Sequence, residues 1–127
     1  AAQRGVDVRI VTPHIPDKKT VFLMTRSHYP KLQQAGVKIL EYTPGFIHAK
    51  QVLCDDACAV VGSINFDYRS LVHHYECGVW MWKTSCIPDI KKDFEELFAV
   101  CTDMKDLKQN WLTRLLCSFG AAFSPLL

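Results

Sequence analysis

The side chains best suited to chemistry lie on two neighbouring segments in the middle of the chain. His48 and Lys50 stand two positions apart in an apolar stretch, so on an extended strand both side chains point to the same side. Ser63 and Asn65 share a side in the same way, just after the next apolar stretch. An imidazole beside ammonium, hydroxyl and amide donors suits a phosphoryl group, because the donors neutralise its oxygens and the ring nitrogen can attack or carry a proton. This pattern predicts a phosphate site.

A β-hairpin is expected to position these residues. Strands are predicted over 46–54 and 58–62, with a tight turn at Asp55 and Asp56 that makes them antiparallel neighbours. Gly62 ends the second strand and, without a side chain, lets another group approach the backbone closely.

The remaining elements follow from the apolar pattern and from proline and glycine. Strands alternating with helices predict an α/β or α+β layered fold in one domain over 1–127. From Asp106 the chain is amphipathic and then apolar, which favours a docked helix, with a segment lying at a lipid interface as the alternative. The other predicted elements are a strand closed by Pro13, a helix with Asp17 as its N-cap that is interrupted before Pro30, a short helix ending at Gly36, strands over 37–42 and 75–82, and a helix opened by Pro88.

Composition limits the class of partner. The net charge of +2 is too small to indicate a nucleic-acid surface, so no nucleic-acid partner is expected. No apolar run reaches the length of about 18 residues that a membrane-spanning helix needs. The six cysteines follow no familiar zinc or disulfide spacing, and Cys54 and Cys58 are predicted to be small buried side chains in a reducing compartment.

The spacing of these residues resembles a known signature. His48, Lys50 and Asp55 stand as H-x-K-x4-D, and Gly62-Ser63-Ile64-Asn65 stands as G-S-x-N; together they resemble the HKD motif of the phospholipase D superfamily. Further segments are similar to the C-terminal half of bacterial cardiolipin synthases, and the resemblance covers the whole chain. It implies an α/β, phospholipase D-like layered fold, with a mixed β-sheet flanked by helices and one HKD half. The similar segments are Gly36-Val37-Lys38-Ile39, Phe46 to Lys50, Asn65 to Ser70 and Ser124-Pro125-Leu126-Leu127.

The resemblance implies four catalytic residues, which are His48, Lys50, Asp55 and Glu76. His48 would be one of two active-site histidines and, since the N-terminal histidine is usually the nucleophile in such enzymes, the general acid and base. Glu76 matches the acid that accepts a hydrogen bond from the other ring nitrogen of the histidine and fixes its tautomer. Asp55 would complete the motif as a structural or supporting residue at the turn, with Asp56 as the less well spaced alternative.

The resemblance also implies the reaction. Lys50, Ser63 and Asn65 would bind the phosphate oxygens, and neither a metal nor another cofactor would be needed. Transfer through a phosphohistidine would join two phosphatidylglycerols to cardiolipin and release glycerol. Alternatives are a phospholipase D-type phosphodiester hydrolase or nuclease, and a non-catalytic half-domain that binds phosphate or lipid.

The chain contains one such motif where the reaction needs two. His14 and His28 have no lysine two positions on, so neither begins a second motif. The second HKD half is therefore expected from a missing N-terminal region or from a dimer mate, and the chain is expected to be a fragment of a longer enzyme. The resemblance implies contact with a membrane surface, and localisation at the bacterial cell membrane through N-terminal helices.

One position departs from the family pattern. Cardiolipin synthases commonly have asparagine before the aromatic residue and the glutamate, whereas this chain has His74-Tyr75-Glu76. His73 and His74 are expected to lie in a loop or at the start of a strand, and both are poor candidates for catalysis.

Overall fold

A computed structural model describes residues 1–105, which form two compact units. The first unit contains residues 1–47 and the segment from residue 100, and the second contains residues 48–99. The predicted segment from Asp106 to Leu127 lies outside the described residues. Within the described part, no helix is both long and apolar enough to cross a membrane.

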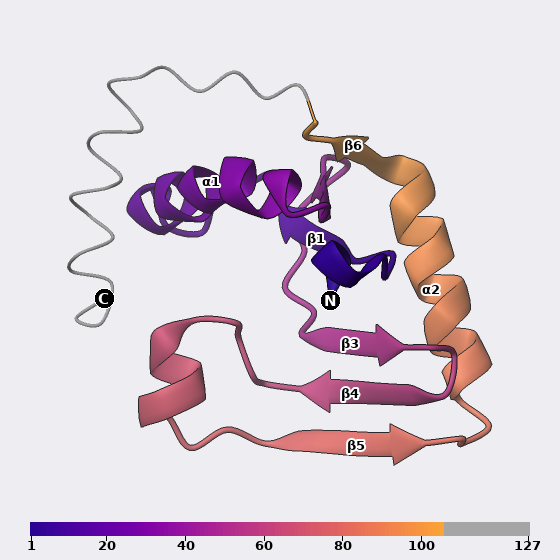
Figure 1. Ribbon diagram of the computed structural model, residues 1–127. Helices are drawn as coiled ribbons and strands as arrows, with labels where there is room; N and C mark the ends of the chain where they lie inside the picture. The colour runs from indigo at the N-terminus through magenta and orange to yellow at the C-terminus, as the bar shows by residue number, and fades with distance from the viewer. Residues whose placement is uncertain (106–127) are drawn as a thin grey trace. The chain divides into compact units, whose positions relative to one another are not determined.

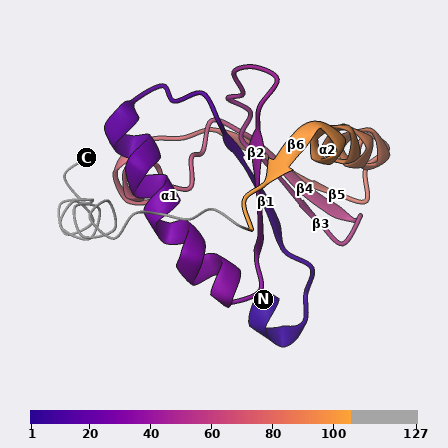
Figure 2. The same cartoon turned by 90° about the horizontal axis from the view of Figure 1, so that it is seen from above.

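The first unit is built on a mixed three-stranded sheet (Figure 1). Strand β2 (Lys38–Tyr42) is central, with β1 (Arg9–Pro13) parallel to it on one side and β6 (Cys101–Asp103) antiparallel on the other. A 3-10 turn, Ala2–Arg4, precedes β1. Because β1 and β2 are parallel, the chain must cross over between them, and α1 (Lys19–Gln34) makes this crossover along one side of the two strands (Figure 2).

Helix α1 differs from the prediction in two ways. It runs through Pro30 without interruption, because Tyr29, which is 2% exposed, and Leu32 anchor it in the core with Ile39 and Met104. The N-cap position is Lys18 rather than Asp17, and no side chain caps it.

The C-terminal end of α1 was correctly predicted at Gly36. This glycine has a φ of 95°, and its N–H donates to the Gln33 carbonyl at 2.9 Å, while the Val37 N–H donates to the Leu32 carbonyl at 3.0 Å. These two bonds form a Schellman motif, in which a left-handed residue satisfies the last helical carbonyls.

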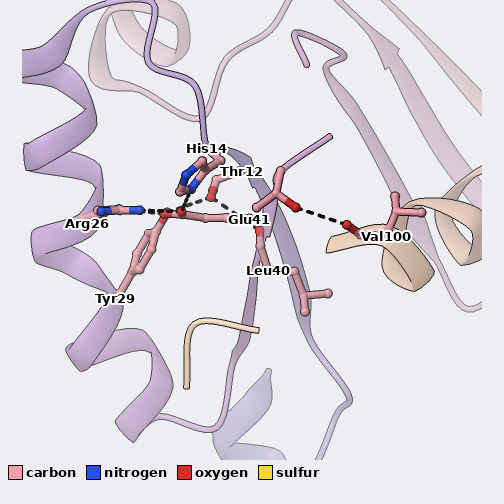
Figure 3. A network of polar contacts seen from close by, with 8 residues as sticks. Thr12, His14, Arg26, Tyr29, Leu40, Glu41 and Val100 are labelled. Atoms are coloured by element: carbon pink, nitrogen blue, oxygen red, sulfur yellow. Dashed lines mark hydrogen bonds and ion pairs between the residues drawn. The ribbon is translucent and has the colours of Figure 1, made fainter. Parts of the chain in front are cut away.

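A buried carboxylate joins helix α1 to the sheet (Figure 3). Glu41 on β2 is fully buried, and Arg26 donates to it twice, from Nε to Oε1 at 2.8 Å and from Nη2 to Oε2 at 2.6 Å. His14, directly after β1, donates from Nδ1 to Oε2 at 2.8 Å, and the Tyr29 hydroxyl donates to Oε1 at 3.0 Å. The Tyr29 oxygen in turn accepts from the Thr12 hydroxyl at 2.7 Å. The ring of partners satisfies a charge that would be costly to bury unpaired.

The same contacts set the charge state of Glu41. Burial alone would raise the pKa of its carboxyl, but the hydrogen bonds from Arg26 and His14 outweigh burial and hold the pKa below its usual value. Glu41 is therefore ionised at neutral pH.

The second unit is an antiparallel three-stranded sheet (Figure 1). Its strands β3 (Gln51–Cys54), β4 (Cys58–Gly62) and β5 (Gly78–Trp82) are paired in chain order, with β4 in the centre. The predicted hairpin is confirmed, and its turn places Asp55 and Asp56 at φ values of 51° and 52°.

Helix α2 (Ile87–Val100) follows β5, in agreement with the prediction of a helix opened by Pro88. It is fastened to the hairpin by two polar contacts. The Lys91 ammonium lies 2.5 Å from the Asp56 carboxylate, and Gln51 donates to Asp93 at 2.8 Å.

Two predicted strands are shorter in the structure. The strand predicted over 46–54 begins only at Gln51, and the one predicted over 75–82 begins only at Gly78. Their common neighbour β4 ends at Gly62, so the residues before Gln51 and Gly78 have no continuing strand to pair with. The prediction that Cys54 is buried was wrong: its side chain is exposed, and Cys58 is half-buried.

We expect Glu41→Gln to destabilise the full chain by about 3 kcal/mol, because a neutral amide leaves the Arg26 charge without its carboxylate. Denaturant unfolding at neutral pH measures this. Since the pKa of folded Glu41 lies below the unfolded value of about 4.3, its stabilisation is present above that value and is lost as the pH falls through the folded pKa. The free energy of unfolding of the Glu41→Gln variant should not show this decrease at acid pH.

Glu96→Gln is the matched control, since this glutamate is exposed and pairs with Lys92 one helical turn away at 3.8 Å. Its loss should cost no more than about 0.5 kcal/mol. Equal effects of the two substitutions would contradict the role of Glu41.

Candidate active site

The second unit contains all six predicted site residues. The start of β3, the end of β4 and the start of β5 lie at the same end of the antiparallel sheet. Lys50 precedes β3, Ser63 follows β4 and Glu76 precedes β5, so the three come from adjacent segments. The topology therefore gathers residues that are far apart in the sequence.

His48 and Lys50 are in direct contact, as their spacing predicted. The Lys50 Nζ lies 2.8 Å from the His48 Nδ1 and 2.8 Å from the His48 carbonyl oxygen. An ammonium group can only donate, so the Nδ1 accepts and the ring proton of neutral His48 is assigned to Nε2. In this neutral form the ring can take up a proton at Nδ1 once Lys50 moves away, whereas a general acid needs the imidazolium, which carries a proton on both nitrogens.

Ser63 connects the end of β4 to Glu76. Its hydroxyl donates to the Glu76 Oε2 at 2.5 Å and accepts from the Cys77 N–H at 3.0 Å. Its own backbone N–H donates to the Cys77 carbonyl at 2.9 Å. These bonds close the base of the loop over residues 64–76 and fix one oxygen of the carboxylate.

Gly62 makes this closure possible. A β-carbon at this position would lie 2.2 Å from the Cys77 carbonyl oxygen and 2.6 Å from the Gly78 Cα, both far inside van der Waals contact. The predicted close approach is confirmed, and the approaching group is the backbone that begins β5. Glycine is therefore required because the two chain segments nearly touch.

Glu76 has a second neighbour that the sequence did not indicate. The Nδ1 of His74 lies 3.4 Å from its Oε1, with side-chain exposures of 45% for the histidine and 15% for the glutamate. The Ser63 hydroxyl lowers the pKa of Glu76 below its usual value, and the Ser70 side chain and His74 act in the same direction. Glu76 is thus a carboxylate with defined partners; its inferred pairing with a catalytic imidazole stays a prediction.

Asn65 is exposed in the loop, two residues after Ser63. The loop continues into a short π-helix, Arg69–His73, that the sequence did not predict. The Asp67 carboxylate accepts from the Ser70 N–H at 2.7 Å and holds the start of this turn. An aspartate that accepts from the N–H three residues later is a capping signal at the start of a helical turn, and it could have indicated the element.

Asp55 is placed apart from the other five residues. It occupies the turn between β3 and β4, which is the opposite end of the hairpin from Lys50 and Ser63. There its carboxylate accepts from the Cys54 thiol at 3.5 Å. This placement fits the structural role that was predicted for Asp55. It does not bring Asp55 to the end of the hairpin where a phosphate is expected to bind.

His73 and His74 occupy different environments. His73 belongs to the π-helix rather than to a loop or strand start, and its ring packs edge-on against Tyr68 at 5.3 Å between centroids. His74 follows the helix in the predicted loop.

The arrangement can bind one anion from one side. At one end of the sheet it offers an imidazole, an ammonium and the exposed amide of Asn65, while the proton of the Ser63 hydroxyl is taken by the Glu76 carboxylate. No three metal-ligating side chains lie together within residues 1–105.

Comparison with solved structures defines the class of fold. The crystal structure of Nuc from Salmonella typhimurium, a phospholipase D family member, superposes with a TM-score of 0.66 and 19% identity over 80% of this chain and 66% of that chain. The predicted α/β, phospholipase D-like fold is confirmed, with its mixed sheet in the first unit and an additional antiparallel sheet in the second.

Sequence comparison gives the family. The family model for the PLD-like domain of cardiolipin synthase matches residues 1–98, and the chain belongs to this family. A cardiolipin synthase of Geobacillus kaustophilus is 39% identical over 100% of this chain and 26% of its own length. An uncharacterised protein of Streptococcus mutans is 58% identical over 76% of this chain and 21% of its own length. The chain thus spans about a quarter of the length of these relatives.

We expect Gly62→Ala to destabilise the full chain by about 2 kcal/mol or more, because the new methyl group forces β4 and β5 apart at the site. Denaturant unfolding measures the change. Gly45→Ala is the control, since a β-carbon there would meet only the Tyr42 ring, at 3.9 Å. If both variants are equally stable, the close approach at Gly62 is not a constraint on this protein.

Proposed function

We propose that the chain is the C-terminal catalytic half of a phosphatidyltransferase of the cardiolipin synthase type. The supporting observation is the convergence of His48, Lys50, Ser63 and Glu76 at one end of the second sheet in a chain of this family. In this proposal residues 1–127 form one catalytic domain, and the donor is phosphatidylglycerol.

The proposed reaction has two steps through a phosphohistidine. A histidine from the second half attacks phosphorus and displaces glycerol, whose oxygen takes the Nε2 proton of the His48 imidazolium and leaves the ring neutral. His48 then removes the hydroxyl proton of a second phosphatidylglycerol, and that oxygen attacks the phosphohistidine to give cardiolipin. The first step starts from the imidazolium of His48, so the Lys50 ammonium must first leave the Nδ1 atom that it contacts in the structure.

The phosphate oxygens are held by donors of the chain itself. Lys50 neutralises charge, and Asn65 adds a hydrogen bond to an oxygen that does not react. Ser63 can add another only when its hydroxyl proton, which Glu76 accepts in the structure, turns to the phosphate. Under this proposal neither a metal nor another cofactor takes part.

The proposal requires a second HKD half. The relatives are about four times as long as this chain, which leaves room for that half within one polypeptide. We place the complete protein at the bacterial cell membrane, where its phospholipid substrate resides, and we propose no nucleic-acid partner.

The substrate assignment is tested by incubating the full-length protein with labelled phosphatidylglycerol, with and without EDTA. We expect cardiolipin and glycerol in equal amounts, at a rate that EDTA does not change. Phosphatidate as the main product would show hydrolysis instead. Binding without product would show a non-catalytic half-domain, and loss of activity in EDTA would overturn the metal-independent mechanism.

The role of His48 is tested in the same assay. His48→Ala should reduce transfer by a factor of about 10³ or more, because a required proton carrier is lost, while thermal unfolding stays unchanged. His28→Ala on the exposed side of α1 is the control and should retain activity. Wild-type turnover by the His48 variant would refute the site.

A further inference from the structure

The Glu76 carboxylate is held at both of its oxygens. Ser63 donates to Oε2 at 2.5 Å, and the Nδ1 of His74 lies 3.4 Å from Oε1. Rotation about the last torsion of a glutamate side chain is weakly restricted, so one partner alone leaves the plane of the carboxylate undefined. A partner at each oxygen defines that plane.

The two partners differ in how they are themselves fixed. Ser63 is tied into the backbone by its bonds with Cys77, so it cannot move without opening the start of β5. His74 follows the π-helix, and its backbone N–H donates to the Arg69 carbonyl at 2.8 Å. This bond fixes the backbone position from which the His74 side chain extends. The π-helix thereby places His74 beside Oε1 of the Glu76 carboxylate.

The neighbouring histidine provides an internal comparison. His73 is the preceding residue and is also exposed to solvent, yet its ring packs against Tyr68. The orientation toward Glu76 is therefore specific to His74 and is not a general property of histidines in this loop.

We propose that His74 is a positioning residue of the active site, which holds the Oε1 side of Glu76 so that the carboxylate presents a fixed face to a catalytic imidazole. The inference rests on the proposed function, because it assigns His74 to the same reaction. His74 acts through Glu76 and is not assigned a contact with the substrate.

Substitutions of His74 can distinguish the position of its N–H group from the acid–base chemistry of the imidazole ring. The Nδ1 of histidine and the amide nitrogen of asparagine are both bonded to Cγ, so His74→Asn can place an N–H at the same position. His74→Gln carries its amide one bond further out, and His74→Ala removes the donor. Rescue by asparagine but not by glutamine is expected if position is what matters.

The kinetic test uses the full-length protein with phosphatidylglycerol vesicles. We expect His74→Ala to lower kcat about tenfold with KM unchanged, since a positioning residue acts on the transition state. His74→Asn should recover most of kcat, His74→Gln should behave like alanine, and His73→Ala should match the wild type. Wild-type kcat in His74→Ala, or an equal loss in His73→Ala, would overturn the inference.

A second measurement does not depend on turnover. Carbon-13 NMR of the glutamate carboxyl groups in the full-length protein, with Glu76→Gln to assign the signal, gives the titration midpoint of Glu76. We expect a higher midpoint in His74→Ala than in the wild type and no change in His73→Ala. Identical midpoints in all three proteins would overturn the contact, and with it the inference. If the wild type converts no phosphatidylglycerol, the proposed function fails, and the NMR comparison alone decides whether His74 holds Glu76.

Discussion

The close approach of Gly62 to the backbone at Cys77 and Gly78 is the constraint on which the second unit depends. Because no side chain separates β4 from β5 there, the Ser63 N–H can donate to the Cys77 carbonyl, and its hydroxyl can accept from the Cys77 N–H and still reach Glu76. A loop of more than ten residues is closed at its base by this contact. The position of Glu76 is thus fixed by the end of one strand and the start of the next.

Polar side chains find their hydrogen-bond partners in different surroundings in the two units. In the first unit, Glu41 is fully buried, and its partners come from α1 and from His14 directly after β1, so the ion pair also fixes the packing of the helix on the sheet. In the second unit, His48 and Lys50 are accessible and satisfy one another. A buried group of the first kind stabilises the fold, whereas an accessible group of the second kind can exchange partners when an anion arrives.

Much of the site could be predicted from the sequence, because its residues follow a fixed spacing on a hairpin. The contact of His48 with Lys50 and the closeness at Gly62 both follow from spacing and residue type. The course of α1 through Pro30 could not be predicted, because burial of Tyr29 and Leu32 overrides the local preference of proline. The π-helix and the approach of His74 to Glu76 were also missed, since both depend on how a loop returns to the sheet rather than on any periodic pattern.

The contact between Lys50 and His48 has a consequence for the way an anion is received. An ammonium group has three N–H bonds, and the His48 ring and carbonyl take two of them, which leaves the third for an incoming oxygen. The same nitrogen atom then touches both the ring and the ligand. The length of one lysine side chain, anchored two residues from the histidine, sets how far apart the proton carrier and the bound oxygen are held, so lengthening or shortening that side chain by one methylene changes this separation while the charge stays the same.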